Sequence, residues 1–383
     1  MHLPHPWFPF VKKCWKNIDM KRFALVAASL LCCAALSGKI TPEKSIPASD
    51  SRITYIGRTL IQGDSVSFDW SGVYARVSFT GGYLALRAGD THCNYYNVWI
   101  DKGMGETPDL VVKIDRPDTL LVLFNAPEKK PRAHKAIIQK RSEGEQGTTT
   151  FREFTARGIF SDADPLKPRV IEAVGDSYTC GYGSESDSRN DPFIVAEENA
   201  NLTYEFYLAR YFDADCFVVA HSGRGIARNY GDAVPGEWMP DLYLRVFDKD
   251  PEYLYKPSVK PAITTVYLGT NDFSVDKQPS KRSFVRNYIK LISEIKANYG
   301  ENHPVLCIAP MHDRLHEDYI RSAADECGFP EVYFVGFDPR LHDWDGDLGA
   351  AWHPNRHGHR KIALALLPYI STITGWPLED KVL

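Results

Sequence analysis

Two residues that lie far apart in the sequence, Ser177 and His353, could together break an ester bond. Ser177 ends the segment Val-Gly-Asp-Ser, directly after an apolar run, and His353 precedes the last expected helix. A serine hydroxyl attacks a carbonyl carbon when a base removes its proton, and neutral imidazole does this near pH 7. Because Gly-Asp-Ser is also common as a turn with a helix cap, the pair needs support from other residues.

Two further segments supply groups that would stabilise the charge formed in such a reaction. Gly223 and Asn271 each follow an apolar run, in the segments His-Ser-Gly-Arg-Gly and Gly-Thr-Asn-Asp. The attacked carbonyl oxygen becomes an oxyanion, and one preorganised donor is typically worth about 2.7–4 kcal/mol. We therefore expect an oxyanion hole made of the backbone N–H groups of Ser177 and Gly223 and the side-chain amide of Asn271. His353 would act first as base and then as acid.

The elements that must position these residues occupy the second half of the chain. Apolar, β-branched runs typical of strands buried in a parallel sheet occur at 169–174, 216–220, 262–268, 305–309 and 332–335. Helical patterns lie between or after them, at 201–211, 281–298, 317–327 and 357–369. This alternation predicts an open α/β fold over residues 165–377. Active sites of such folds gather at the carboxyl ends of the strands, which Ser177, Gly223 and Asn271 follow.

The first half of the chain has a different period. Short runs of alternating apolar and polar residues, separated by glycines, occur at 66–70, 74–79, 83–87, 97–100 and 120–124. Short strands at this spacing predict an antiparallel β-sandwich over residues 51–160. A helix fits this half only around 127–142, where proline and basic residues crowd. A chain of 383 residues also exceeds the usual size of a single core, which supports two domains.

The N-terminus predicts export to the periplasm or the exterior. Basic residues between positions 12 and 22 precede an apolar run at 23–36, and small residues follow it. This is the order of a secretory signal peptide, and the run is shorter than the ~20 residues of a transmembrane helix. We assign 1–38 to an upstream segment and signal peptide, with Met20 as an alternative start, and 39–50 to a linker. Cys32 and Cys33 leave a lipid anchor open as an alternative.

Composition narrows the class of partner. The formal net charge of −4 gives no electrostatic attraction to nucleic acid or to an anionic membrane. Removal of the signal peptide would leave five cysteines, with no Cys-x-x-Cys or Cys/His spacing of a metal site. We therefore expect no metal, no other cofactor, no nucleic-acid partner and no integral membrane span. The oligomeric state is left open.

The motifs together resemble a known family. Gly-Asp-Ser at 175–177, Ser-Gly at 222–223, Gly-Thr-Asn-Asp at 269–272 and His-Pro at 353–354 are similar to the four blocks of the SGNH (GDSL) hydrolases. Segments 68–74 and 94–101 resemble the N-terminal jelly-roll domain of carbohydrate esterase family 2. The resemblance covers residues 51–373. It implies a flavodoxin-like three-layer α/β/α hydrolase domain after a jelly roll, with the catalytic roles assigned above.

The resemblance also implies an activity, the removal of acetyl groups from plant-type polysaccharides such as xylan or glucomannan, without a cofactor. Two alternatives stay open. An acylhydrolase of lipid or small aryl esters would use the same scaffold, although the sequence has no long apolar lid segment. A non-catalytic glycan-binding protein, with the sandwich as its binding module, would have no need of Ser177, Asn271 and His353 together.

The sequence departs from the family pattern just before the histidine. Many SGNH enzymes carry an aspartate three residues before it, and here Ala350 stands at that position. Asp347 could fold back onto the imidazole, or a backbone carbonyl such as that of Trp352 could accept the Nδ1 proton. The second arrangement, a Ser–His dyad, is the one we favour. Trp238 and Trp344 are candidates for stacking on sugar rings.

Overall fold

The computed structural model describes residues 42–128, 130–231, 236–274, 278–310 and 314–383. Residues Glu43–Leu383 form one compact unit. The predicted signal peptide and residues 39–41 of the predicted linker lie outside the described residues, so export and lipid anchoring stay predictions. Among the helices that the structure describes, none has the length and apolar character needed to cross a membrane.

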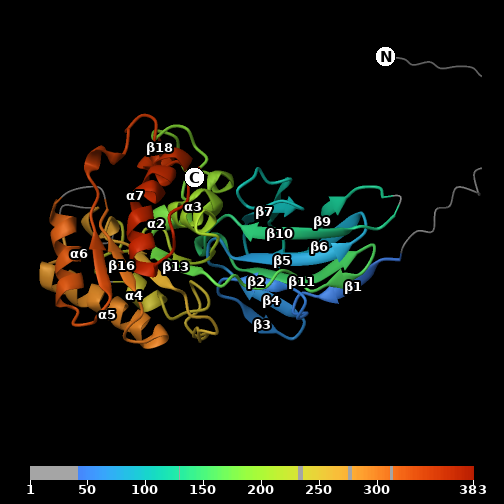
Figure 1. Ribbon diagram of the computed structural model, residues 1–383, viewed down its shortest axis with the longest axis horizontal. Helices are drawn as coiled ribbons and strands as arrows, with labels where there is room; N and C mark the ends of the chain where they lie inside the picture. Colours follow the sequence, from blue (N-terminus) through green and yellow to red (C-terminus); the bar gives the residue numbers. More distant parts are fainter. Residues whose placement is uncertain (1–41, 129, 232–235, 275–277, 311–313) are drawn as a thin grey trace, which may run out of the picture. The chain divides into compact units, whose positions relative to one another are not determined.

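The N-terminal domain is the predicted sandwich of two antiparallel sheets (Figure 1). One sheet has the order β3-β4-β11-β6-β9, with β1 also paired to β11. Its strands are β1 (Lys44–Pro47), β3 (Leu60–Gln62), β4 (Ser65–Phe68), β6 (Tyr83–Asp90), β9 (Thr119–Asn125) and β11 (Thr149–Ala156). The other has the order β12-β5-β10-β7-β8, with β2 also paired to β5. Its strands are β2 (Thr54–Ile56), β5 (Tyr74–Thr80), β7 (Asn94–Ile100), β8 (Leu110–Ile114), β10 (Ala133–Lys140) and β12 (Phe160–Ser161).

Two strands of the sandwich differ from the sequence expectations. β10 occupies the region in which only a helix was considered, because His134, Ala136 and Ile138 are buried in alternation, the period of a strand. β1 lies inside the predicted linker. It pairs with β11 and buries Ile46 in the core of the sandwich, so the first sheet begins before residue 51.

The C-terminal domain contains a parallel sheet of five strands in the order β14-β13-β15-β16-β17, the flavodoxin-like order. The strands are β13 (Val170–Gly175), β14 (Asp215–Ala220), β15 (Ile263–Tyr267), β16 (Val305–Ile308) and β17 (Val332–Val335). Its longer helices are α3 (Tyr204–Tyr211), α5 (Lys281–Tyr299), α6 (Arg314–Glu326) and α7 (Arg356–Thr374). Shorter elements are α2 (Ser177–Cys180), α4 (Met239–Leu242) and the hairpin of β18 (Leu348–Gly349) and β19 (His353–Pro354).

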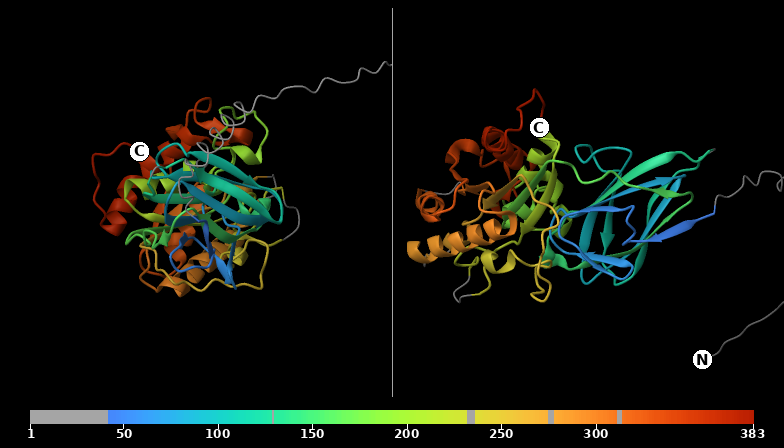
Figure 2. Two further views of the ribbon diagram at one scale, coloured as in Figure 1. Left: turned by 90° about the vertical axis from the view of Figure 1, so that its right-hand side faces the viewer. Right: turned by 60° about the horizontal axis from the view of Figure 1, so that its bottom comes forward.

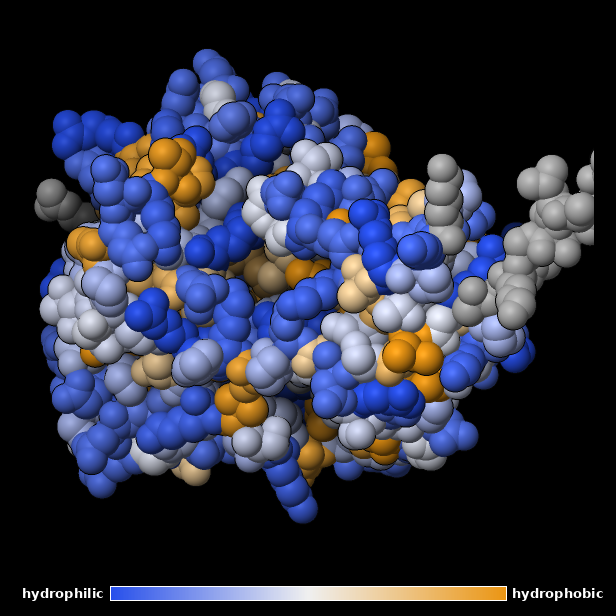
Figure 3. All heavy atoms as spheres, turned by 45° about the vertical axis from the view of Figure 1, so that its right-hand side comes forward, coloured by the Kyte–Doolittle hydropathy of each residue, from blue (hydrophilic) through white to orange (hydrophobic). Residues whose placement is uncertain are grey.

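The helices cover both faces of this sheet, as the α/β/α prediction requires (Figure 2). Neighbouring residues of a strand point to opposite faces. Val174 of β13 belongs to the core that contains Leu291 of α5 and Ile320 of α6. Ala173 belongs to the core with Leu366 of α7 and the buried residues of α3. On the face drawn in Figure 3, hydrophilic residues predominate and hydrophobic ones form small separate groups.

Buried polar contacts join the two domains within this compact unit. The Arg58 guanidinium of the sandwich lies 3.3 Å from the Glu172 carboxylate of β13, and both side chains are buried. The Tyr74 hydroxyl donates a 2.6 Å hydrogen bond to Asp215 of β14. Arg76 forms an ion pair with the same carboxylate. Charged groups of the parallel sheet therefore have their partners in the sandwich.

Candidate active site

Ser177 stands at the tight turn between β13 and α2, at the carboxyl end of the sheet. Asp176 caps α2, and its carboxylate accepts the Tyr178 N–H at 3.1 Å. Gly175 is required by the turn, because a Cβ there would lie 1.9 Å from Thr179 Oγ1. This close packing holds Ser177 at the end of the strand, where it is 6% exposed.

His353 lies against Ser177, 176 positions away in the sequence. The imidazole Nε2 is 2.8 Å from the Ser177 Oγ, the distance of a hydrogen bond along which a proton can pass. His353 begins β19 and pairs with Gly349 of β18. Asn355 then caps α7 by accepting the N–H groups of residues 357 and 358, which fixes the direction of the chain after the histidine.

The second imidazole nitrogen of His353 lies within hydrogen-bond distance of a backbone carbonyl. Nδ1 lies 2.9 Å from the carbonyl oxygen of Ala351. With Nε2 facing the serine as acceptor, Nδ1 carries the proton and donates it to this oxygen. From the sequence we had named the carbonyl of Trp352, but the carbonyl that contacts the imidazole is that of Ala351. Asp347 does not fold back onto the ring, since its carboxylate lies 2.5 Å from the Lys361 Nζ.

The Ala351 carbonyl reaches His353 because the backbone turns through two left-handed residues. Ala351 has φ 51° and Trp352 has φ 66°, a conformation that costs about 1–2 kcal/mol for a residue with a side chain. Two backbone hydrogen bonds hold it, from the Ala351 N–H to the Asp191 carbonyl (3.0 Å) and from the Trp352 N–H to the Arg189 carbonyl (3.2 Å). The strain therefore lies at the candidate site.

Aromatic rings pack against the imidazole of His353, a contact that was not predicted from the sequence. The Tyr182 ring lies 4.3 Å from the imidazole centroid at an interplanar angle of 34°. Phe193 stacks on Tyr182 in turn, at 3.8 Å and 16°. Tyr178 approaches the imidazole edge-on at 5.5 Å. Only the position of Tyr182 soon after Gly-Asp-Ser hinted at a site role.

The structure brings the predicted oxyanion residues to one edge of the sheet. Gly223 follows β14 with φ 78°, which favours glycine. The Asn271 side-chain amide donates to the Arg224 carbonyl at 2.8 Å and to the Asp176 carboxylate at 3.2 Å. Asn271 therefore bridges the turn that contains Gly223 and the residue that precedes Ser177.

Two buried carboxyl groups brace these turns. The Asp272 carboxylate accepts the N–H groups of residues 226, 227 and 228 at 2.7–3.0 Å. Burial raises the pKa of Asp272 to about 7, against the opposing effect of these hydrogen bonds. Burial also raises the pKa of Asp176 to about 7, against its hydrogen bond from Tyr178. Both residues act as hydrogen-bond acceptors that fix loops.

Three exposed aromatic side chains lie beside candidate residues or contact their neighbours. Trp352, which precedes His353, is 51% exposed, and its ring lies 6.2 Å from that of Trp344. The Arg189 guanidinium covers the Trp352 ring at 4.6 Å. Tyr230 is 71% exposed, and its N–H donates to the Gly223 carbonyl at 2.7 Å. Sequence reasoning had named Trp344 but neither the Trp352 side chain nor Tyr230.

Trp238, the other tryptophan predicted to stack on sugars, has a different setting. It is half-buried and precedes α4, and the N–H of the next residue, Met239, donates to the Gly225 carbonyl at 2.9 Å. Trp238 thus lies beside the turn that contains Gly223, where its contact with substrate stays a prediction.

Two groups of side chains in the described part of the chain have the atom types and spacing of metal ligands. They are Glu143 with Cys180 and Glu198, and Glu145 with His221 and Asp248. Hydrogen bonds within the protein occupy both groups. The Cys180 thiol donates to Glu143 at 3.4 Å, and the His221 Nδ1 lies 2.6 Å from Asp248. These contacts account for the clustering without an ion.

The chain matches two protein families, one in each domain. Residues 55–161 match the carbohydrate esterase 2 N-terminal family. Residues 173–361 match the GDSL-like lipase/acylhydrolase family. The boundaries of the two matches fall close to those of the sandwich and of the α/β domain.

Similar proteins share this arrangement. The cellulase/esterase CelE of Acetivibrio thermocellus is 30% identical over 346 residues, which are 88% of this chain but only 41% of that protein. An acetylxylan esterase/glucomannan deacetylase of Cellvibrio japonicus is 25% identical over 347 residues, 83% of this chain and 90% of that one. The structure of a family two carbohydrate esterase from Clostridium thermocellum in complex with cellohexaose is 28% identical, with a TM-score of 0.78 over 85% of this chain and 100% of that chain. With a carbohydrate esterase 2 N-terminal domain joined to a GDSL/SGNH hydrolase domain, this chain is a homologue of the enzymes of carbohydrate esterase family 2.

Proposed function

We propose that the protein is a serine esterase that removes acetyl groups from plant-type polysaccharides. The observation that carries the proposal is the 2.8 Å contact between the His353 Nε2 and the Ser177 Oγ at the carboxyl end of β13. A nucleophile and a base within hydrogen-bond reach, with the base held by a third group, are the minimum that acyl transfer requires.

In the first half of the reaction, the Ser177 Oγ attacks the carbonyl carbon of an acetylated sugar and its proton passes to the His353 Nε2. The carbonyl π electrons move onto the oxygen, which becomes the oxyanion. The bond between this carbon and the sugar oxygen then breaks, and Nε2 returns the proton to the departing hydroxyl. The products are a deacetylated sugar and acetyl-Ser177.

In the second half, water attacks acetyl-Ser177 and gives its proton to the His353 Nε2. Collapse of the second oxyanion releases acetic acid as the Ser177 Oγ takes the proton back from Nε2, and the acid then loses its own proton to solvent to give acetate. In both halves the ring carries a positive charge for a moment, and its Nδ1–H stays directed at the Ala351 carbonyl at 2.9 Å. We therefore favour a Ser–His dyad whose imidazole is oriented by this carbonyl.

The oxyanion would receive the N–H groups of Ser177 and Gly223 and one N–H of the Asn271 amide. The Asn271 amide contacts the Asp176 carboxylate at 3.2 Å and the Arg224 carbonyl at 2.8 Å. The longer contact is the one that a substrate oxygen would replace, while the shorter one keeps the amide in place. One such donor is typically worth about 2.7–4 kcal/mol of the barrier.

The surroundings of the pair favour a carbohydrate as the alcohol part of the ester. Trp352 directly precedes His353, its ring lies 6.2 Å from that of Trp344, and Tyr230 hydrogen-bonds to the Gly223 carbonyl. All three side chains are exposed, and aromatic faces pack against sugar rings. The names of relatives support xylan or glucomannan as the polysaccharide, since the Cellvibrio japonicus protein is called an acetylxylan esterase/glucomannan deacetylase. The basic, apolar and small residues of positions 12–38 support export of the protein, and such polymers lie outside the cell.

The test measures acetate release from acetylated xylan, acetylated glucomannan and sugar acetates, side by side. Ser177→Ala and His353→Ala should each abolish release, whereas the control Ser293→Ala, on α5, should leave it unchanged. Undiminished release by Ser177→Ala would refute the mechanism, whereas no release by the parent chain would favour the glycan-binding alternative. A preference for long-chain over short-chain nitrophenyl esters would favour the lipid alternative.

A further inference from the structure

Glu143 connects the sandwich to the turn that contains Gly223. It follows β10, in the connection to β11, and is 1% exposed. Its Oε2 accepts a 2.7 Å hydrogen bond from the backbone N–H of Ser222. Because Ser222 directly precedes Gly223, a carboxylate of one domain holds the backbone beside the proposed oxyanion donor of the other.

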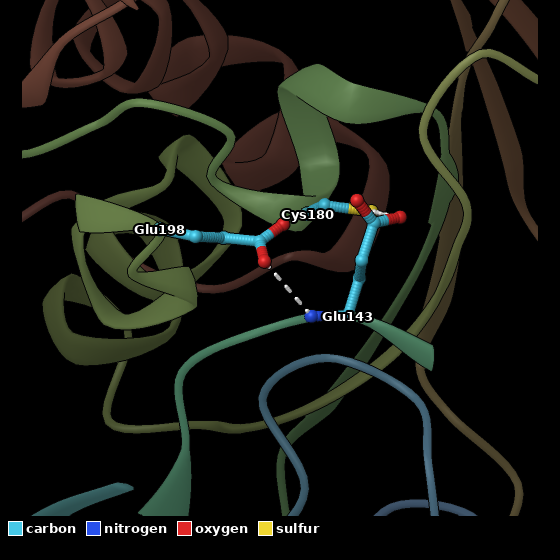
Figure 4. Close-up of side chains that lie close together, drawn as sticks. All are labelled: Glu143, Cys180 and Glu198. Carbon is cyan, nitrogen blue, oxygen red and sulfur yellow. Dashed lines mark hydrogen bonds between the residues drawn. The ribbon is translucent and has the colours of Figure 1, made fainter. Parts of the chain in front are cut away.

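Buried neighbours hold the Glu143 side chain in turn (Figure 4). The sulfur of Cys180, three residues after Ser177, lies beside the Glu143 carboxylate and donates to it at 3.4 Å. Glu198 points at the Glu143 backbone, whose N–H donates to the Glu198 Oε2 at 3.2 Å. Both ends of Glu143 are therefore fixed by residues of the hydrolase domain.

Burial changes the pKa values of the groups around Glu143. Burial, and then the charge of Glu143, raise the pKa of Glu198 well above its ordinary value, which favours the protonated form. Burial likewise raises the pKa of the Cys180 thiol. The Lys140 Nζ lies nearby and donates to the carbonyls of Ser142 (2.6 Å) and Glu143 (2.9 Å), and burial lowers the pKa of this amine.

The same connection contacts the residue before Ser222 as well. The Glu145 carboxylate lies 3.4 Å from the His221 Nε2, and the Asp248 carboxylate lies 2.6 Å from the His221 Nδ1. Burial alone would lower the pKa of His221, but the hydrogen bond and charge of Asp248 outweigh it and raise that pKa. The connection between β10 and β11 thus contacts two consecutive residues of the turn.

We propose that Glu143 is a positioning residue for the oxyanion hole, a role that rests on the esterase function proposed above. The Gly223 N–H belongs to the peptide that links Ser222 to Gly223, and glycine itself places no side chain against rotation of that peptide. The hydrogen bond at the Ser222 N–H holds the preceding peptide plane. Without it the Gly223 N–H would turn away from the oxyanion, and a misplacement of ~1 Å can cost ~10²-fold in rate.

Two substitutions separate the reach of the Glu143 side chain from its charge. Glu143→Gln keeps the length and an oxygen that accepts the Ser222 N–H but removes the charge. Glu143→Asp keeps the charge but withdraws the carboxylate by about 1.5 Å, the length of one carbon–carbon bond. If position is what Glu143 supplies, Gln should keep kcat within about threefold, and Asp should lose about ten- to hundredfold with KM nearly unchanged.

The measurement is kcat and KM for 4-nitrophenyl acetate in the full chain, with thermal unfolding of each variant. Tyr74→Phe is the matched control, because it removes another buried hydrogen bond between the domains, that to Asp215, and should leave kcat unchanged. Glu143→Met, which has similar length and no acceptor, should lose as much kcat as Glu143→Asp. It decides the question if Glu143→Asp fails to fold.

Full activity of the folded Asp or Met variant would overturn the positioning role, and so would a Gln variant as impaired as the Asp variant. Ser177→Ala is measured in the same series. If Ser177→Ala is inactive while the Asp and Met variants are fully active, the role of Glu143 fails and the esterase function stands. If Ser177→Ala stays active, Ser177 is not the nucleophile, and the serine-esterase mechanism is overturned together with the Glu143 role that rests on it.

Discussion

Asp347→Asn tests whether a carboxylate or the backbone orients His353. The Asp347 carboxylate lies 2.5 Å from the Lys361 Nζ and accepts the Asp343 N–H at 2.6 Å. The amide keeps an acceptor for that N–H and loses only the ion pair with a half-exposed lysine, which is worth about 0.5–1.5 kcal/mol. We therefore expect kcat within about threefold of the parent value and a melting temperature lowered by roughly 1–5 °C.

A triad would give a very different result. Where a carboxylate orients the imidazole, its replacement by an amide lowers kcat by about 10⁴-fold. Initial rates on 4-nitrophenyl acetate separate the two outcomes easily, with His353→Ala as the inactive reference. The control Asp338→Asn changes an exposed acid paired with Arg340 and should have no effect on kcat. A loss in Asp347→Asn as large as that in His353→Ala, in a variant that still unfolds cooperatively, would refute the dyad.

Substitutions at three further positions probe the same site. Gly183→Ala should lower kcat by about tenfold or more, because the new Cβ would lie 2.7 Å from the Cβ of Ala350 and displace the turn that orients His353; unchanged kinetics would show that this turn tolerates displacement. Tyr182→Leu should lower kcat about two- to thirtyfold, because it removes the aromatic ring that packs against the charged imidazole. Tyr182→Phe keeps that ring and should keep most of the parent kcat. Equal losses of kcat in the two variants would count against a role of the ring. Trp352→Ala should raise KM for acetylated xylan and leave kcat for 4-nitrophenyl acetate nearly unchanged. A lowered kcat on 4-nitrophenyl acetate as well would place the effect in the backbone turn instead.

The parallel strands were the most predictable part of the fold. β13, β14 and β15 begin and end within one residue of the predicted bounds, because strands buried on both faces are continuous apolar runs. The expected helix at 201–211 begins only at Tyr204. Residues Ala200–Leu202 form a separate 3₁₀ turn, and Thr203 is the cap of α3. The local sequence pattern was thus sufficient to predict which elements form, but it was less accurate for the residues at which they begin and end.

β10 shows where local pattern misleads. The prolines that suggested a helix precede β10 and Lys135 lies on its exposed side, while burial alternates from His134 to Ile138. Lys140 and Arg141, at the end of the segment, are buried. Whether a short run with charged neighbours becomes strand or helix depends on the sheet that receives it. β10 lies between β5 and β7, and that position decided its structure.

The pairing of Ser177 with His353 follows from motif order, but the group behind the histidine does not. The Ala351 carbonyl points at the imidazole only because two residues in succession adopt positive φ values and the carbonyls of Arg189 and Asp191 hold them. Neither alanine nor tryptophan signals such a conformation in a sequence. Contacts such as that of Glu143 with Ser222 also depend on how two domains pack, which no local pattern encodes.

The sandwich is therefore better understood as part of the hydrolase architecture than as a detachable binding module. Glu172 lies in the middle of the parallel sheet and has no exposed surface, and Arg58 of the sandwich is its cationic partner at 3.3 Å. Asp215 depends in the same way on Arg76 and Tyr74. Removing one partner of a buried ion pair typically costs about 3–5 kcal/mol, so two such losses approach the whole stability of a domain. A hydrolase domain without its sandwich would retain Ser177 and His353 in sequence but lose the partners that keep its sheet, and the turn at Gly223, in place.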